Sequence, residues 1–313
     1  MSHQTIALLI PAYNAASFLP RLLRSAQAQS EPFDMIWVYD DCSTDNTTAV
    51  AEQMGARVMR GNINRGCSAG KDALARYVEA DWLHFHDADD ELLPNFVSLA
   101  RKWISGKCPD VILFDYEYRD DETDELLSIR NFDADELECD PRSYAIREQI
   151  NPFCGLYRRS AFLEAGGYID PPEMLYNEDV ACHIRLAFAG LSFGAENEVS
   201  IINYRRGGSM SAANQLKCLQ SHFAVMRRTL AHEDVGPYLQ DVAMKLWHVA
   251  GALAAYGDSD NALYAVDLAA QIAPPPTSSG SGVFRAVARL HPRLALRLRE
   301  RWIRMAKPAL RAK

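Results

Sequence analysis

The sequence of 313 residues contains seven cysteines but no C-x-x-C pair. Paired, regularly spaced cysteines are typical of a structural zinc site or of the disulfide framework of a small secreted domain. Because the count is odd and the spacing is irregular, the sequence predicts neither kind of site. It fits a protein with reduced thiols in the cytoplasm.

Long apolar runs are also missing. A helix needs about 20 consecutive apolar residues to cross a bilayer, and no stretch of the chain reaches that length. The first apolar run, at residues 6–10, is too short for the core of a signal peptide. We therefore expect a cytoplasmic protein that does not span a membrane.

The composition excludes several classes of protein. Hydrophobic residues make up 48% of the chain and charged residues 24%, which excludes an intrinsically disordered or collagen-like protein. The net charge of −8 is unevenly distributed, since residues 284–313 contain ten basic residues and one acidic residue. The rest of the chain is strongly acidic, and an acidic body does not attract a phosphate backbone. We therefore expect no nucleic acid as its ligand.

Short apolar runs alternate with helical periodicity in the first 115 residues. The apolar runs lie at 6–10, 35–39, 57–59, 82–85 and 111–114, and the helical segments lie at 18–26, 45–54 and 68–78. Repeated units of this kind predict an α/β fold with a mostly parallel sheet and helices on both faces. The charge-rich segment 116–150 suits a surface excursion, and helical patterns return at 177–189 and 215–272.

Polar residues follow three of the predicted strands directly. They are the segments 11–14, 40–41 and 86–91, and the last has four carboxylates among residues 87–91. Ligands of an open parallel sheet bind beyond the carboxyl ends of its strands. Crowded carboxylates repel one another unless a cation neutralises them, which points to Mg²⁺ or Mn²⁺. The alternative is a solvated acidic turn before the next helix, but the position straight after an apolar strand favours the metal.

Five short motifs occur in order along the chain: P-A-Y-N (11–14), D-D-C-S-T-D (40–45), N-R-G-C-S-A-G-K-D (64–72), D-A-D-D (87–90) and N-E-D (177–179). Together they resemble the family 2 glycosyltransferases of the GT-A fold over residues 5–210. The resemblance implies a Rossmann-like, mostly parallel sheet flanked by helices. It also implies a nucleotide-diphosphate sugar as donor, with a UDP-sugar expected first.

The resemblance assigns a role to each motif. Asp41 would bind the nucleobase, and Pro11, Ala12, Tyr13 and Asn14 would wall the base and the ribose. Asp87, Ala88 and Asp89 form the D-x-D motif, in which Asp89 is the expected ligand of Mn²⁺ or Mg²⁺ and Asp87 lies near the ribose or the metal. Asp90 supports either role.

Two further segments bear on catalysis. Asp179 matches the general base of the family, with Glu178 beside it, although both could simply complement a helix dipole. Arg205, in the stretch 204–211, resembles a residue that closes over the donor diphosphate, although the same stretch could be a solvated surface loop. Lys71 keeps the positive charge of the usual A-R-N triplet and would contact the donor. Cys42 replaces the glycine of D-D-G-S.

The resemblance implies an inverting, metal-dependent transfer of a sugar to a hydroxyl of a glycan or lipid-linked glycan in cell-surface polysaccharide biosynthesis. The Q-x-x-R-W signature of processive synthases is absent, so a non-processive enzyme is expected. A sugar-phosphate nucleotidyltransferase would need a glycine-rich loop at 11–14, where this sequence has P-A-Y-N, so that function is disfavoured. A non-catalytic, membrane-associated scaffold that binds nucleotide-sugar is the remaining alternative, because Cys42 and Lys71 depart from the family pattern.

The C-terminal part separates from this domain in pattern. We expect a GT-A domain at 1–212, a helical extension at 213–273, a Pro/Ser/Gly linker at 274–283 and a basic amphipathic tail at 284–313. In the tail, arginines and the apolar residues Leu294, Leu298, Trp302 and Met305 fall on different helix faces. Such a helix fits an anionic membrane surface at the inner face of the cell membrane. Packing of the apolar stripe on the helical extension is the open alternative.

Overall fold

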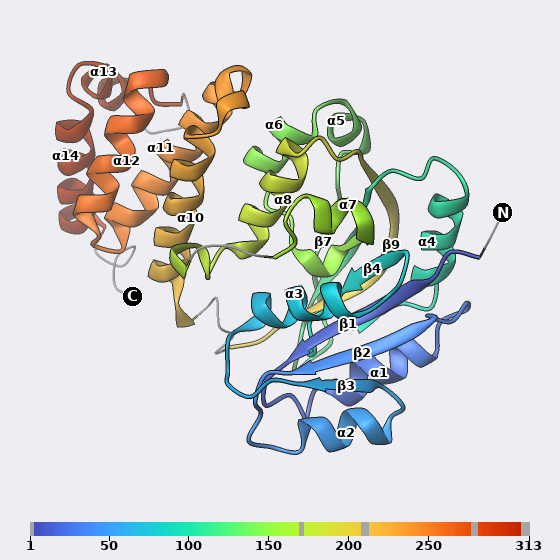
Figure 1. Cartoon of the computed structure of the whole chain (residues 1–313). Coiled ribbons are helices and arrows are strands. Elements are labelled where there is room, and N and C mark those ends of the chain that lie inside the picture. Colours follow the sequence, from blue (N-terminus) through green and yellow to red (C-terminus); the bar gives the residue numbers. More distant parts are fainter. Residues whose placement is uncertain (1–2, 169–171, 208–212, 277–280, 308–313) are drawn as a thin grey trace. The chain divides into compact units, whose positions relative to one another are not determined.

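The computed structural model describes residues 3–168, 172–207, 213–276 and 281–307 (Figure 1). The chain forms two compact units. The first comprises Met1–Tyr144, Ile150–Asp170 and Arg185–Ser209, and the second comprises Ala145–Gln149, Pro171–Ile184 and Met210–Lys313. The second unit thus takes in two short segments of the stretch that the sequence assigns to the GT-A domain.

The first unit is built on a mixed sheet with the strand order β3-β2-β1-β4-β8-β6-β9-β5, and β7 pairs with β6. The bounds are β1 (Ile6–Ala12), β2 (Met35–Asp40), β3 (Arg57–Arg60), β4 (Trp82–Phe85), β5 (Glu91–Leu92), β6 (Val111–Asp120), β7 (Leu126–Arg130), β8 (Gly155–Arg158) and β9 (Phe193–Arg205). Strand β1 is buried along its whole length, as expected for an apolar run in the centre of a parallel sheet.

The first four strands are mutually parallel, as the strand–helix alternation predicts. The second half departs from a mostly parallel pattern, since β8 runs antiparallel to both β4 and β6. Strand β6 continues to Asp120 and forms a hairpin with β7. The charge-rich segment after residue 115 is therefore partly strand, because pairing with β7 and β9 satisfies its backbone.

Helices cover both faces of the first four strands. The helices in this part of the chain are α1 (Leu19–Gln27), α2 (Thr47–Gln53), α3 (Cys67–Tyr77), α4 (Phe96–Ser105), α5 (Ala134–Cys139), α6 (Pro141–Arg147), α7 (Arg159–Glu164) and α8 (Glu178–Phe188). Helices α6 and α8 have residues in both units. The chain moves outward from β1 to β3 and then returns past β1 to β4, so right-handed crossovers place α3 opposite α1 and α2 (Figure 1). One face of α1 buries its predicted apolar residues Leu19, Leu22, Leu23 and Ala26. Short 3₁₀ turns lie at η1 (Pro152–Cys154) and η2 (Pro172–Met174).

The second unit is helical, as its periodicity predicts. It contains α10 (Gln215–Leu230), η3 (Glu233–Tyr238), α11 (Leu239–Ala255), α12 (Ser259–Ile272), α13 (Gly282–Leu290) and α14 (Pro292–Ala306). Small and branched residues of α11 and α12 form its core, among them Val242, Leu246, Leu253, Ala265 and Val266. Helix α13 begins at Gly282, inside the predicted linker, because the Ser281 hydroxyl caps it by accepting from Phe284 N–H at 3.2 Å. No helix in the described part of the chain has the length and hydropathy needed to span a membrane.

Candidate functional site

The parallel pairing of β2, β1 and β4 brings the first three polar segments to one edge of the sheet. Ala12 lies opposite Asp40 in the β1–β2 register. Beyond β4, His86 N–H donates to Leu9 carbonyl at 3.0 Å and carries the chain on toward Asp87. The carboxyl ends of the strands therefore meet where the sequence predicts the donor site.

The loop after β1 is fastened to the loop after β2. Asn14 has a φ of +49°, its N–H donates to Ser43 Oγ at 2.9 Å, and its Oδ1 accepts from Thr44 N–H at 2.8 Å. These two hydrogen bonds hold Asn14 to the loop after β2. Pro11 and Ala12 are buried, whereas the Tyr13 ring is about half exposed. Of the four residues predicted to wall the nucleotide, Tyr13 and Asn14 are exposed, and Tyr13 offers the aromatic ring.

Asp41 is buried at the start of α3. Its carboxylate accepts from the backbone N–H groups of Arg65 and Gly66, at 2.9 Å and 2.7 Å respectively. A carboxylate at this position complements the positive end of the helix dipole. Each carboxylate oxygen has two lone pairs, so these bonds leave acceptor capacity for a nucleobase, the role predicted for Asp41.

Cys42, the residue after Asp41, departs from the family pattern but keeps a backbone conformation that suits glycine. Cys42 adopts a φ of +63° and is exposed. This left-handed conformation is the one that glycine adopts without steric cost, which accounts for the glycine of D-D-G-S. Here a cysteine keeps the same turn, and its thiol lies 3.6 Å from the carbonyl of Asn62.

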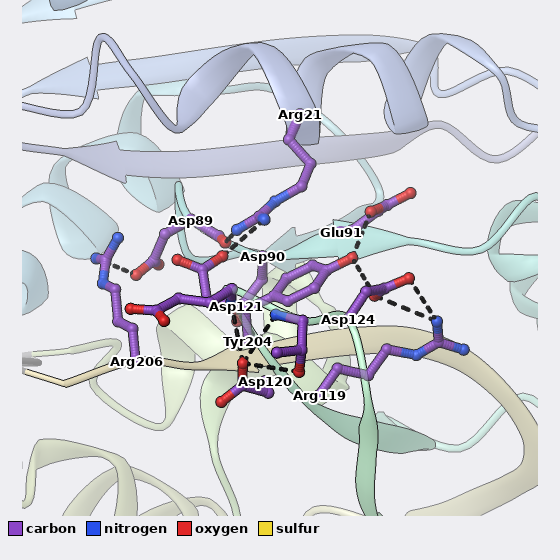
Figure 2. A network of polar contacts seen from close by, with 12 residues as sticks. Arg21, Asp89, Asp90, Glu91, Arg119, Asp120, Asp121, Asp124, Tyr204 and Arg206 are labelled. Atoms are coloured by element: carbon purple, nitrogen blue, oxygen red, sulfur yellow. Dashed lines mark hydrogen bonds and ion pairs between the residues drawn. The ribbon is translucent and has the colours of Figure 1, made fainter.

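Two arginines flank the predicted metal ligand Asp89 (Figure 2). Arg206 pairs with Asp89 Oδ2 at 2.5 Å, and Arg21 of α1 donates to the Asp89 carbonyl. Both guanidinium groups also stack on aromatic rings, Arg206 3.9 Å from the centroid of Phe18 and Arg21 3.7 Å from that of Tyr204. The cations are thus fixed in place beside the D-x-D turn.

Lys71 supplies a third positive charge to the turn. Its side chain is buried, its Nζ lies 3.8 Å from Asp87 Oδ1, and it lies over the Tyr168 ring at 5.4 Å. Lys71, which is predicted to contact the donor, therefore lies beside Asp87, the first carboxylate of D-x-D. Asp87 is itself more than one-third exposed.

Asp90 joins the D-x-D turn to the end of β9. It is buried and accepts from Asn203 Nδ2 at 2.6 Å and from Tyr204 N–H at 2.9 Å. Burial, reinforced by the charges of Asp87 and Asp89, raises the pKa of Asp90 well above its usual value. Asp90 therefore bonds two distant segments of the chain, and the supporting role predicted for it at the metal or the ribose stays a prediction.

The electrostatics of the turn favour an added cation. Burial and the charge of Asp87 raise the pKa of Asp89, and this rise is opposed by Arg206 and Arg21. Mg²⁺ and Mn²⁺ are commonly held by one or two carboxylates together with substrate phosphates. Asp87 and Asp89 fit that donor set, although no cluster of three or more His, Cys, Asp or Glu side chains arranged for a metal occurs in the described residues.

Two buried histidines precede the turn. His84 Nδ1 donates to the Gly155 carbonyl at 2.9 Å, and its Nε2 lies 3.0 Å from His86 Nδ1. Burial lowers the pKa of both histidines, that of His86 to about 3. They are therefore uncharged at neutral pH and add no positive charge to the D-x-D turn.

Arg205, the last residue of β9, and Arg206, which follows it, make different contacts. Arg205 stacks over the Tyr118 ring, with its guanidinium carbon 4.0 Å from the ring centroid, while Arg206 pairs with Asp89. The role predicted for Arg205 stays a prediction. The contacts of Arg206 and Arg21 were not predicted. The Arg-Arg pair at 205–206 is a signal for Arg206, whereas Arg21 belongs to no motif. Residues 208–211 of the same predicted motif lie outside the described residues.

Asp179 and Glu178 form the first turn of α8, in the second unit. The Asp179 carbonyl accepts from His183 Nδ1 at 2.7 Å. The preceding residue, Asn177, donates from its side chain to the Cys218 carbonyl at 2.8 Å. Burial, and then the charges of Glu178 and Asp179, raise the pKa of the Cys218 thiol. The roles predicted for both carboxylates stay predictions.

Solved structures resemble the chain over nearly its whole length. The TarS fragment 1–349 of Staphylococcus aureus in complex with UDP-GlcNAc matches with a TM-score of 0.72 and 16% identity, covering 96% of this chain and 92% of that one. A mannosyltransferase from Pyrobaculum calidifontis in complex with GDP-Man and Mn²⁺ matches with a TM-score of 0.61 and 16% identity, covering 96% and 88%. At this identity the likeness establishes the GT-A fold.

Sequence comparisons identify the family. A 4,4'-diaponeurosporenoate glycosyltransferase of Staphylococcus haemolyticus is 41% identical over 95 residues, which are 28% of this chain and 25% of that protein. The poly(ribitol-phosphate) β-N-acetylglucosaminyltransferase TarS is 28% identical over 116 residues, or 34% and 20%. These matches span a quarter or less of each relative. The sequence pattern of glycosyl transferase family 2 matches residues 7–166, slightly more than half of the chain. The chain therefore belongs to glycosyl transferase family 2.

Proposed function

We propose that this glycosyltransferase moves a sugar from a nucleotide-diphosphate sugar, a UDP-sugar in the first instance, to a hydroxyl of an acceptor in a metal-dependent, inverting and non-processive reaction. The observation that supports this most strongly is the D-x-D turn at the carboxyl edge of the sheet. There Asp87 and Asp89 lie beside Lys71, Arg21 and Arg206. Matching structures hold UDP-GlcNAc and GDP-Man.

The site offers separate groups for the parts of such a donor. The aromatic face of Tyr13 and the spare acceptor capacity of Asp41 suit the base and the ribose. Lys71, Arg206 and Arg205 suit the diphosphate, because guanidinium and ammonium groups bind phosphate oxygens strongly. Asp87 and Asp89 would hold Mn²⁺ or Mg²⁺, which when bound stabilises the departing nucleoside diphosphate.

Asp179 is the proposed general base. A carboxylate that removes the proton from an acceptor hydroxyl allows that oxygen to attack the anomeric carbon directly. A single displacement of this kind inverts the anomeric configuration. Glu178 is buried beside it and would keep the first turn of α8 acidic.

The acceptor belongs to the same proposal. We assign it to the hydroxyls of a glycan or lipid-linked glycan used in cell-surface polysaccharide assembly. Support comes from the relatives, which include TarS and the chondroitin and hyaluronan synthases of Pasteurella multocida. They act on polymers, and each is matched over a small part of its length.

The deciding experiment measures release of nucleoside diphosphate from a panel of nucleotide sugars, with and without Mn²⁺ or Mg²⁺. Asp179→Asn should lower turnover by about 10²- to 10⁴-fold, the usual contribution of a general base, and leave donor binding intact. Asp260→Asn, an exposed aspartate in the first turn of α12, is the matched control and should keep full activity. Turnover that survives Asp179→Asn contradicts the assignment of the base.

Donor binding separates the enzyme from the scaffold alternative. In calorimetry with Mn²⁺, Asp89→Ala should weaken nucleotide affinity, and unchanged affinity would contradict the metal assignment. Metal-dependent binding of donor without turnover, in the presence of candidate acceptors, would instead support a non-catalytic nucleotide-sugar-binding protein.

A further inference from the structure

Helix α14 has three distinct faces. The first packs within the helical unit through Ala295, Leu296 and Ile303, all buried. The second is an apolar stripe open to solvent, formed by Leu294, Leu298, Trp302 and Met305. The sequence left open whether this stripe packs on the helical extension. Within the second unit it does not, because neighbouring positions of the helix make the packing contact instead.

The third face is basic. Arg293, Arg297, Arg301 and Arg304 follow one another at helical spacing and are all exposed. Arg293 pairs with Asp267 of α12, and Arg304 donates to the Ala254 carbonyl at 3.2 Å, so these two help to fix α14 to α12 and α11. The one acidic residue of the helix, Glu300, is buried. Apart from the Arg293–Asp267 pair, no exposed carboxylate of α14 balances the positive charge of this face.

Helix α13, which packs against α14, carries further exposed residues of the same two kinds. Val283 and Leu290 are exposed, and the exposed Arg289 adds to the charge. The basic apolar surface is defined here as Val283, Leu290, Leu294, Leu298, Trp302 and Met305 with Arg289, Arg297 and Arg301. Exposed apolar residues are unremarkable singly, but a continuous stripe with a basic border usually marks an interaction site.

We propose that the basic apolar surface of α13 and α14 docks on an anionic lipid membrane. A stripe of leucine, tryptophan and methionine on a convex helix inserts among acyl chains, while the bordering arginines reach the phosphate groups of the lipids. Charge selects this occupant over a second copy of the chain, because two identical basic surfaces repel. The proposal does not depend on the proposed sugar transfer.

The test is co-sedimentation of the full-length protein with phosphatidylcholine vesicles, with and without phosphatidylglycerol. We expect binding to the anionic vesicles, weaker binding to the neutral ones, and a decline as salt screens the arginines. Trp302 emission should shift to the blue on binding, a change absent from Trp302→Phe. Absence of binding to anionic vesicles by folded protein would overturn the proposal.

Matched variants separate docking from a general surface effect. Leu298→Ser should weaken binding about tenfold, which is the loss expected from one leucine kept out of an apolar phase. Leu127→Ser is the control, because Leu127 lies on β7 and is equally exposed, at 52%. Equal loss in the two variants contradicts the proposal.

The charge has its own pair of variants. Arg297→Gln and Arg301→Gln should each weaken binding about fivefold, whereas Arg24→Gln, an exposed arginine of α1, should not. Sedimentation of the free protein as a dimer that Leu298→Ser dissociates would assign the surface to a second copy and overturn the membrane proposal. Nucleoside diphosphate release with a soluble acceptor should be unchanged in all these variants, which keeps the two proposals separable.

Discussion

At the scale of single residues, Arg206 occupies the oxygen that the proposed metal ion would use. It pairs with Asp89 Oδ2 at 2.5 Å, and that oxygen belongs to the carboxylate proposed to hold Mn²⁺. Under the proposal, a divalent ion could use it only after the guanidinium moves aside, and Arg206 would then be available to the donor diphosphate.

The variant Arg206→Gln should therefore separate metal binding from nucleotide binding. We expect tighter binding of Mn²⁺ to the protein alone, because a competing cation is gone, and weaker binding of the nucleoside diphosphate with Mn²⁺. Both are measurable by titration calorimetry. Arg205→Gln leaves the Asp89 pair in place, so its Mn²⁺ affinity should equal that of the wild type. Weaker Mn²⁺ binding in Arg206→Gln would contradict this competition.

Cys42 stores a small amount of backbone strain. A side chain with a β-carbon at a φ of +63° destabilises the folded protein by about 1 to 2 kcal/mol. Glycine removes this strain, but its greater conformational freedom in the unfolded chain offsets part of the gain. Cys42→Gly should raise the free energy of unfolding by up to about 1 kcal/mol in urea titrations. Cys42→Ala keeps the β-carbon and should give no such gain, and equal effects of the two changes would argue against strain.

At the scale of elements, Gly70 allows α3 to lie close to the sheet. A β-carbon there would come within 2.7 Å of the Tyr39 ring and 3.4 Å of the Pro11 side chain. Because Lys71 follows directly, this close approach also sets the position of the cation beside Asp87. The glycine that stands in place of the alanine of A-R-N thus fits the close packing against Tyr39 of β2.

The expected result for Gly70→Ala is a loss of about 1 to 3 kcal/mol in unfolding free energy, the usual cost of overpacking. Gly251→Ala is the comparison, because Gly251 lies within α11 and its β-carbon would meet only Arg299 Nη1, at 3.4 Å. The unfolding free energy of Gly251→Ala should rise by up to about 1 kcal/mol, because alanine has a higher helix propensity than glycine. Thermal unfolding measures both, and a stabilising Gly70→Ala would contradict the packing argument.

The elements also show how far the sequence could predict the structure. Strands β1, β2 and β4 and the turn after each were predicted, because buried parallel strands are continuous apolar runs and their polar ends are sharp. The outer half of β6 and strand β7 were not, because residues such as Asp115 and Arg119 are charged and only their partners in the sheet make them strand. The contact of Arg21 with Asp89 was not predicted for a similar reason, because a lone arginine on an amphipathic helix forms no motif.

At the scale of the whole molecule, the partly buried His222 makes the stability depend on pH. Burial, and then the charge of Lys245, lower the pKa of His222 to about 4, against about 6.5 in the unfolded chain. Between these values the unfolded chain binds a proton that the folded protein does not. Stability is therefore lost as the pH falls from 6.5 toward 4.

Unfolding free energy from urea titrations should fall by up to about 1.4 kcal/mol per pH unit in this window on account of His222. The variant His222→Gln should show a shallower slope than the wild type. His248, on α11, is exposed, so His248→Gln should leave the slope unchanged. A wild-type slope retained in His222→Gln would show that this histidine is not the responsible group.

The bonds of Asp90 also set limits on how the gene can be cut and recombined. The family match ends at residue 166, yet Asn203 and Tyr204, which bind the Asp90 carboxyl, lie beyond it. A fragment that stops at the end of the match would leave that buried acid without these donors and would remove β9 from beside β6. A chimera of two relatives therefore has to inherit residues 87–90 and 203–206 from the same parent.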